Sequence, residues 1–544
     1  MDYAPANPGA GYTAGESAVI GVFRGTNFHL HGISILGKVP APGDASLYAV
    51  SFARDYPGTA AGGHVSGCWI GVAPDGATIS GAKYGITAFH HRDDQRANPA
   101  GIDNLTVGVQ TNSPNPAAEF NVIVQFAIPI DIEGDGARVA GNFIGVLPDG
   151  LHDYNVALDP NYTGEFQFEG AIDIGQHGKN IVIGVDGDGV NDAFERNVIG
   201  GTLPSRLNGY DHTVELYSFP PSAHVIIAGN YIGVGIDGKT QFTNGVPAIN
   251  AAGENASYRI GSDFDGVSDD LEGNVIANNF PSGLFPPAEL AAHAEDLHFF
   301  DQIAPSSRVS FRGNSLINNA PFPAGPSIED RQFLKDYYGE VLLTTTNGLA
   351  PALSTNTTAA RLIGILPRGN LDHPVAILDL YAADPVGLTN GLAANIVNLP
   401  NGFVQGRRYL ASFVEGSTND LDPAPGAFSF DLTGIDLGGA TNLTATATYS
   451  KAQPGTHNDV GVTSPFSVPV VISPAPSGGV LHISDIRVTN GAIQLAWSGG
   501  QGPYDVQQKL GVTNNWQNVA TVITNRQATL PLGQAAAFFR VAGH

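Results

Sequence analysis

Two sequence motifs recur in the first half of the chain and constrain its fold more than any other feature. One motif reads VSGCWIGVAPDG (65–76), VAGNFIGVLPDG (139–150) and IIAGNYIGVGIDG (226–238). The other reads NLTVGVQTNSPNPAAEFNVI (104–123), NIVIGVDGDGVNDAFERNVI (180–199) and YRIGSDFDGVSDDLEGNVI (258–276), at offsets of 76 and 77 residues. Each copy alternates apolar and polar residues and then reaches Gly, Asn or Asp, as a strand followed by a turn does. Repeats that bury one face by stacking on their neighbours form a solenoid, here a parallel β-helix.

The composition agrees with an all-β chain and excludes several classes of protein. Among 544 residues there are 69 glycines and 37 prolines, and 14% are charged, which favours short strands over long helices. A net charge of −25 with scattered basic residues argues against binding to nucleic acid or to an anionic membrane surface. No apolar run is long enough to span a membrane, and the single cysteine excludes an internal disulfide framework.

Changes in the repeat pattern predict three domains. The parallel β-helix is expected over residues 1–326, an immunoglobulin-like β-sandwich over 340–472, and a small fibronectin-like β module over 480–544. Residues 68, 142 and 230 share one position of the repeat, where we expect an inward-facing polar ladder in which Cys68 replaces an asparagine. The N-terminus has no basic-then-apolar leader, so we expect any export signal to have been removed or never present.

These motifs resemble a known family. The repeats GNYIGVGIDG and DGDGVNDAFERNVIGG, followed by TATATYS and GVTSPFS, are similar to secreted bacterial right-handed β-helix repeat proteins. The segments GPYDVQQKL, NNWQNV and AAFFRV resemble small C-terminal β modules of exported proteins from verrucomicrobial and planctomycete relatives. The resemblance implies a right-handed β-helix with C-terminal β modules and a secreted or cell-surface location. It leaves activity open, because the family includes polysaccharide-active enzymes and surface proteins of unknown role.

A third strand in each coil carries the candidate catalytic residues. Aligning AVSFA (49–53), GITAF (85–89), PIDIE (129–133), AIDIG (171–175), VELYS (214–218) and AINAA (248–252) gives a column whose central residues are Ser51, Thr87, Asp131, Asp173, Glu215 and Asn250. Like charges stacked on adjacent strands destabilise a sheet and raise at least one carboxyl pKa, as a general acid requires. We therefore predict that Asp131, Asp173 and Glu215 are catalytic.

Several side chains are candidates for binding a polysaccharide beside this column. Glu133 and Tyr217 occupy the next outward positions on their strands, and aromatic residues are frequent in the preceding loops. The predicted substrate-binding residues are Glu133, Tyr217, Tyr154, Phe168, Tyr210 and His177.

Two turns of the second motif suit a calcium ion. DGDGVND (186–192) and DFDGVSD (263–269) carry alternate Asp and Asn oxygens, the ligands that a hard cation prefers, although neither has the full spacing of an EF-hand. The candidate ligands are Asp186, Asp188, Asp192, Asp263, Asp265 and Asp269. Glu119, Glu195 and Glu272 recur at one repeat position and are expected to bind neighbouring backbone.

The sequence thus predicts a secreted glycoside hydrolase that acts on a neutral polysaccharide, because a charge of −25 would repel acidic glycans. No cofactor is required, and calcium is a candidate structural ion. The C-terminal modules are expected to aid attachment to a cell surface or matrix. Two alternatives stay open: a non-catalytic cell-surface or carbohydrate-binding repeat protein, and a calcium-assisted polysaccharide lyase.

Overall fold

The computed structural model describes residues 17–23, 26–37, 47–53, 61–88, 102–154, 170–175, 178–201, 212–216, 223–242, 244, 248–251, 256–278, 300–301, 308–317, 350–366, 375–383, 406–450, 462–464, 466–472, 482–489, 492–498, 504–509, 516–523, 527–531 and 538–543.

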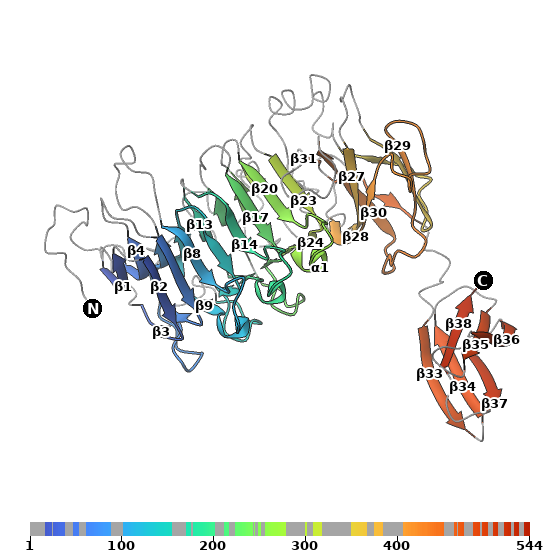
Figure 1. Cartoon of the computed structure of the whole chain (residues 1–544), viewed down its shortest axis with the longest axis horizontal. Helices are drawn as coiled ribbons and strands as arrows, with labels where there is room; N and C mark the ends of the chain where they lie inside the picture. Colours follow the sequence, from blue (N-terminus) through green and yellow to red (C-terminus); the bar gives the residue numbers. More distant parts are fainter. Residues whose placement is uncertain are drawn as a thin grey trace, which may run out of the picture. The chain divides into compact units, whose positions relative to one another are not determined.

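Within these residues, three parallel sheets of eight strands each form the first part of the chain, and every rung contributes one strand to each sheet (Figure 1). The first sheet holds β1 (Ser17–Phe23), β4 (Leu47–Ala53), β7 (Ala82–Ala88), β10 (Phe126–Ile132), β13 (Gly170–Ile174), β16 (His212–Leu216), β19 (Ile249–Ala251) and β22 (Phe300–Asp301). The second sheet holds β2 (Thr26–His31), β5 (Ala61–Ser66), β8 (Asp103–Gly108), β11 (Arg138–Ala140), β14 (Ile181–Gly184), β17 (His224–Ala228), β20 (Ser257–Gly261) and β23 (Arg308–Arg312). The third sheet holds β3 (Ser34–Ile35), β6 (Trp69–Ile70), β9 (Asn121–Ile123), β12 (Asn142–Ile144), β15 (Val198–Ile199), β18 (Tyr231–Ile232), β21 (Val275–Ala277) and β24 (Ser315–Ile317).

The prediction of an all-β chain that begins with a parallel β-helix is therefore confirmed. Inward-facing aliphatic residues of all three sheets fill one continuous core, in which Ile130, Ile172, Val214 and Ile183 are fully buried. This arrangement follows from the period-2 pattern of the repeats, because alternate side chains of a strand point to opposite faces. The right-handed sense of the coil stays an expectation from the resemblance.

Asparagine side chains form an internal ladder where the chain turns into the third sheet. The ladder consists of Asn121, Asn142, Asn197, Asn230, Asn274 and Asn314. The side-chain amide of each of the first five donates to the side-chain oxygen of the next at 2.7–3.0 Å. All six are at most 1% exposed. Cys68 occupies the preceding position, and its backbone N–H donates to Oδ1 of Asn121 at 2.9 Å. The predicted polar ladder is confirmed, and it satisfies amide groups that would otherwise be buried without partners.

Glycine ends the strands of the second sheet that precede the long loops. Gly108, Gly184 and Gly261 have φ values of +99°, +94° and +93°. A Cβ atom at Gly184 would lie 2.0 Å from the backbone oxygen of Ala228 on the next rung. Only glycine allows both this backbone conformation and this close approach.

The remaining strands form small antiparallel sheets, as expected for the C-terminal modules. One sheet has the order β25 (Ala352–Leu353), β26 (Arg361–Ile365) and β29 (Ala427–Asp431). A second has the order β28 (Gly406–Val414), β27 (Val375–Ala383), β30 (Asn442–Ser450) and β31 (Val462–Thr463), with β32 (Val470–Val471) also paired to β30.

Two further three-stranded sheets lie near the C-terminus. Their orders are β33 (His482–Thr489), β34 (Ala492–Ser498) and β37 (Gln527–Pro531), and β36 (Gln517–Ile523), β35 (Tyr504–Lys509) and β38 (Phe538–Gly543). Trp497, Tyr504, Val506 and Leu530 lie together in the core that these strands bury.

Helical structure among the described residues is limited to short turns: α1 (Asp269–Glu272) and the 3-10 turns Pro116–Ala118 and Asp192–Phe194. No helix in the described part of the chain is long and apolar enough to cross a membrane.

The chain divides into two compact units. One comprises Met1–Ser354, Ile363–Ser429 and Asn442–Val470, and the other comprises Thr355–Leu362, Phe430–Thr441 and Val471–His544. All four predicted domain boundaries stay predictions: those at 326, 340 and 480 fall outside the described residues, and the one at 472 lies at the end of a described segment.

Candidate functional site

The acidic column lies on the first sheet in the register that the sequence predicts. Asp131 on β10 pairs with Asp173 on β13, and Asp173 pairs with Glu215 on β16. The neighbouring rungs continue the column with Ser51 and Thr87 on one side and Asn250 on the other. Three acidic residues therefore occupy equivalent positions on three consecutive strands, which lie about 4.8 Å apart.

The carboxylates of Asp131 and Asp173 project from the outer face of this sheet. Their neighbours along each strand, including Ile130 and Ile172, are fully buried in the solenoid core, and adjacent side chains of a strand point to opposite faces. Asp131 and Asp173 themselves are half-buried. Of Glu215 the structure describes the backbone register and not the side chain.

Glu133 extends the acidic cluster toward the next rung. A Cβ atom added at Gly175 would lie 2.4 Å from Cγ and 2.6 Å from Oε1 of Glu133. The Glu133 side chain therefore lies across Gly175, two residues beyond Asp173, and the missing side chain of Gly175 makes room for it.

The other predicted substrate-binding residues do not join the column in the described structure. Tyr154 packs beside Val122 and Val124, which belong to a hydrophobic cluster on the outer face of the third sheet, so its ring lies on a different sheet from the acids. The remaining four candidates lie outside the described residues: Tyr217, Phe168, Tyr210 and His177.

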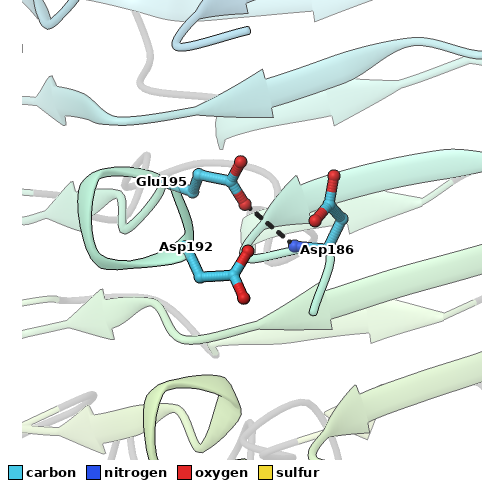
Figure 2. Close-up of side chains that lie close together, drawn as sticks. All are labelled: Asp186, Asp192 and Glu195. Atoms are coloured by element: carbon cyan, nitrogen blue, oxygen red, sulfur yellow. Dashed lines mark hydrogen bonds between the residues drawn. The ribbon is translucent and has the colours of Figure 1, made fainter. Parts of the chain in front are cut away.

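Each of the two acidic turns brings three carboxylates together, but these are not the same three residues that the sequence predicts as ligands. Asp186, Asp192 and Glu195 each offer one oxygen, and these oxygens lie within 4.8 Å of one another (Figure 2). Asp263, Asp269 and Glu272 form the equivalent group in the next repeat. Asp188 and Asp265 belong to neither group; each accepts the backbone N–H two residues further on, at 2.7 and 2.8 Å.

The recurring glutamates were expected to bind neighbouring backbone, and they do. Glu119, Glu195 and Glu272 accept the backbone N–H groups of Gln110, Asp186 and Asp263 at 2.9, 3.1 and 3.3 Å. The sequence did not indicate that Glu195 and Glu272 also complete the acidic groups. The sequence feature that could have indicated this role is the recurrence of the glutamates at offsets of 76 and 77 residues, alongside the aspartates.

Buried arginines lie beside both acidic groups. Arg138 contacts Asp186 at 2.7 Å and forms an ion pair with Glu195, while Arg259 contacts Glu272 at 2.6 Å and Asp263 at 3.2 Å. Burial raises the pKa of Glu195 to about 7, even though the Arg138 charge acts in the opposite direction.

The column also has an acidic member that the sequence alignment missed. Asp301 on β22 pairs with Asn250 and continues the same position by one rung. Its strand consists of two residues that lack the alternating pattern by which the other strands were aligned.

The fold and these sites define a parallel β-helix protein with antiparallel β modules at its C-terminal end. Comparison with protein-family models and with curated proteins finds no match to the chain.

Proposed function

We propose that this chain is a glycoside hydrolase that cleaves a neutral polysaccharide, with Asp131, Asp173 and Glu215 supplying the reacting carboxyls. The observation that carries the proposal is the in-register pairing of these three residues on adjacent strands. Like charges at directly opposed positions weaken a sheet, so a structural role alone gives no reason for such a column.

The spacing of the column suits hydrolysis of a glycosidic bond. One carboxyl must protonate the leaving oxygen while another acts as nucleophile or base. Strands one rung apart are separated by about 4.8 Å, close to the roughly 5–5.5 Å between carboxyls in retaining enzymes. Two rungs correspond to about 9–10 Å, near the upper end of the inverting range of about 6.5–9.5 Å. Asp173 is the central member and is common to both adjacent pairs.

The charge around the column favours a neutral substrate. Glu133 reaches over Gly175 and adds a fourth acidic residue near Asp173, in a chain whose net charge is −25. An anionic glycan would be repelled by this surface. We also propose that the protein is secreted or lies at the cell surface and belongs to the bacterial β-helix repeat family. Its C-terminal modules would then attach it to a surface or matrix.

The test is release of reducing sugar from a panel of neutral and acidic polysaccharides by the full chain. We expect release from a neutral glycan, and we expect Asp173→Asn and Glu215→Gln each to lower kcat by at least about 100-fold. Asp237→Asn is the matched control, because Asp237 is an exposed turn residue whose contacts are with Lys239 and Thr240.

Two outcomes would contradict the proposal. Wild-type protein that releases sugar from none of the substrates is not a hydrolase of this class, and retained binding to one of them would then indicate a recognition surface. Release accompanied by an unsaturated product would indicate a lyase instead.

A further inference from the structure

The loop between β14 and β15 is built around three carboxylates. Asp186 lies just beyond the end of β14, whereas Asp192 and Glu195 lie in and after the 3-10 turn that closes the loop. Figure 2 shows the three side chains lying close together, and one carboxylate oxygen from each lies within 4.8 Å of the other two.

Backbone donors hold these carboxylates in place. The N–H of Asp186 donates to Glu195 at 3.1 Å, and the N–H of Gly189 donates to Oδ2 of Asp192 at 3.0 Å. The N–H of Asp188 donates to Oδ1 of Asp186 at 3.1 Å. The arrangement is therefore organised by the loop itself.

Two buried carboxylate oxygens of the cluster lack a hydrogen-bond partner, and of these Oε1 of Glu195 is ion-paired with Arg138. Asp192 is 4% exposed, and its Oδ1 is buried with no donor among the described residues. Arg138 reaches Asp186 and Glu195 and leaves this oxygen unsatisfied. A buried carboxylate oxygen without a partner is costly, and a cation bound within the cluster would satisfy it.

The local charge also favours a cation. Asp186, Asp188, Asp192 and Glu195 carry four carboxylates, and Arg138 is the cationic side chain that pairs with two of them. The cluster therefore keeps an excess of negative charge after its ion pairs are counted.

We propose that Asp186, Asp192 and Glu195 bind one calcium ion. All three donors are carboxylate oxygens, and no histidine or cysteine belongs to the group, which favours a hard cation over zinc or copper. Calcium also accepts the irregular coordination that a loop provides, whereas magnesium demands near-octahedral geometry.

The ion would stabilise a loop that contacts both neighbouring repeats. Thr111 donates to Oδ2 of Asp186 at 2.9 Å, and Asn191 donates to the backbone oxygens of Thr111 and Ser113 at 2.8 and 3.0 Å. From the other side, Arg259 donates to the backbone oxygen of Asp186 at 3.0 Å. Calcium at this position would therefore stabilise a loop that is hydrogen-bonded to the preceding loop and to β20 of the following rung.

The equivalent loops provide internal comparisons. In the preceding repeat, Gln110 and Pro116 replace Asp186 and Asp192, which removes two of the three ligands. In the following repeat, Asp269 accepts the N–H of Gly266, and Arg259 pairs with both Asp263 and Glu272. Within the described part of the chain, no carboxylate oxygen of that group is buried without a hydrogen-bond partner. The proposal is confined to the loop from Asp186 to Glu195.

The experiment is calorimetric titration of the full chain with calcium chloride after removal of bound metal with a chelator. The wild type should bind calcium and gain about 2–4 °C in its thermal midpoint at saturation. Asp192→Asn keeps the size of the side chain and can still accept from Gly189. It should weaken binding at this site at least about tenfold and abolish the thermal gain.

Asp269→Asn is the matched control, because it makes the same change in the following repeat and should leave this site intact. Stripped wild-type protein that binds no calcium would overturn the proposal without reference to any variant. Calcium binding and thermal gain that survive in Asp192→Asn, or that are lost in Asp269→Asn instead, would overturn the assignment to this loop.

Discussion

At the scale of single residues, stability depends on how buried polar groups are satisfied. The asparagine ladder does this by giving each side-chain amide a partner on the next rung. His64 on β5 shows a different solution. It is 5% exposed, and its Nε2 lies 2.7 Å from the backbone oxygen of Gly108. The neutral ring therefore donates one hydrogen bond and stays buried on the outer side of the second sheet.

This environment predicts a pH dependence of stability. The pKa of His64 is lowered from 6.5, chiefly by burial and in small part by His29 and His31, against the opposing effects of Gly108 and Glu119. The unfolded chain then binds the proton more readily than the folded chain, so the contribution of His64 is present above about pH 6.5 and is lost as the pH falls through its folded pKa.

Thermal midpoints measured from pH 7.5 to 5.5 test this dependence. His64→Gln, whose amide can still donate to Gly108, should lose less stability on acidification than the wild type. His152→Gln, which changes an exposed histidine, should follow the wild type. Equal pH slopes for wild type and His64→Gln would contradict the prediction.

At the scale of the repeating strand and turn, a position can require glycine for two reasons: a positive φ angle, or a neighbouring backbone too close for a Cβ atom. Gly184 and Gly266 have nearly the same φ, +94° and +95°. A Cβ atom at Gly184 would meet the backbone of the next rung, whereas at Gly266 nothing lies within 4 Å. The pair separates the cost of a strained backbone from the cost of a steric clash.

Alanine substitutions at these two glycines should therefore differ. Gly266→Ala should lower the free energy of unfolding by about 1–3 kcal/mol, the usual cost of an unfavourable φ. Gly184→Ala should cost at least about 2 kcal/mol more, because the rungs must also move apart. Denaturant unfolding monitored by circular dichroism measures both changes. Equal losses of unfolding free energy in the two variants would show that the close approach at Gly184 does not add to the cost.

At the scale of the whole molecule, the last rung of the β-helix is joined to the β27–β30 sheet within one compact unit. Arg312 on β23 donates to both oxygens of Asp379 on β27 at 2.9 Å, and these side chains are 4% and 0% exposed. Tyr381 and Phe466 also belong to the solenoid core cluster. Core packing and a buried ion pair therefore close the end of the solenoid.

Replacing one partner of this ion pair should lower the stability of the fold more than replacing both partners. Asp379→Leu leaves the Arg312 charge buried without its partner and should lower stability by about 3–5 kcal/mol. Adding Arg312→Met to Asp379→Leu should restore much of that loss, because the double variant buries no charge. Thermal or denaturant unfolding of the wild type, both single variants and the double variant completes the cycle. A double variant no more stable than Asp379→Leu would contradict the prediction.

The sequence by itself determined the all-β class, the stacking of rungs, the asparagine ladder and the register of Asp131, Asp173 and Glu215. It could do so because strand alternation and the recurring motifs together specify which residues face inward and which share a position on successive rungs. Only the tertiary structure decided the contacts between Arg138 and Glu195, between Arg312 and Asp379, between Glu133 and Gly175, and the packing of Tyr154 on the third sheet. These contacts join side chains that follow no common period, so they depend on how loops and rungs pack in space.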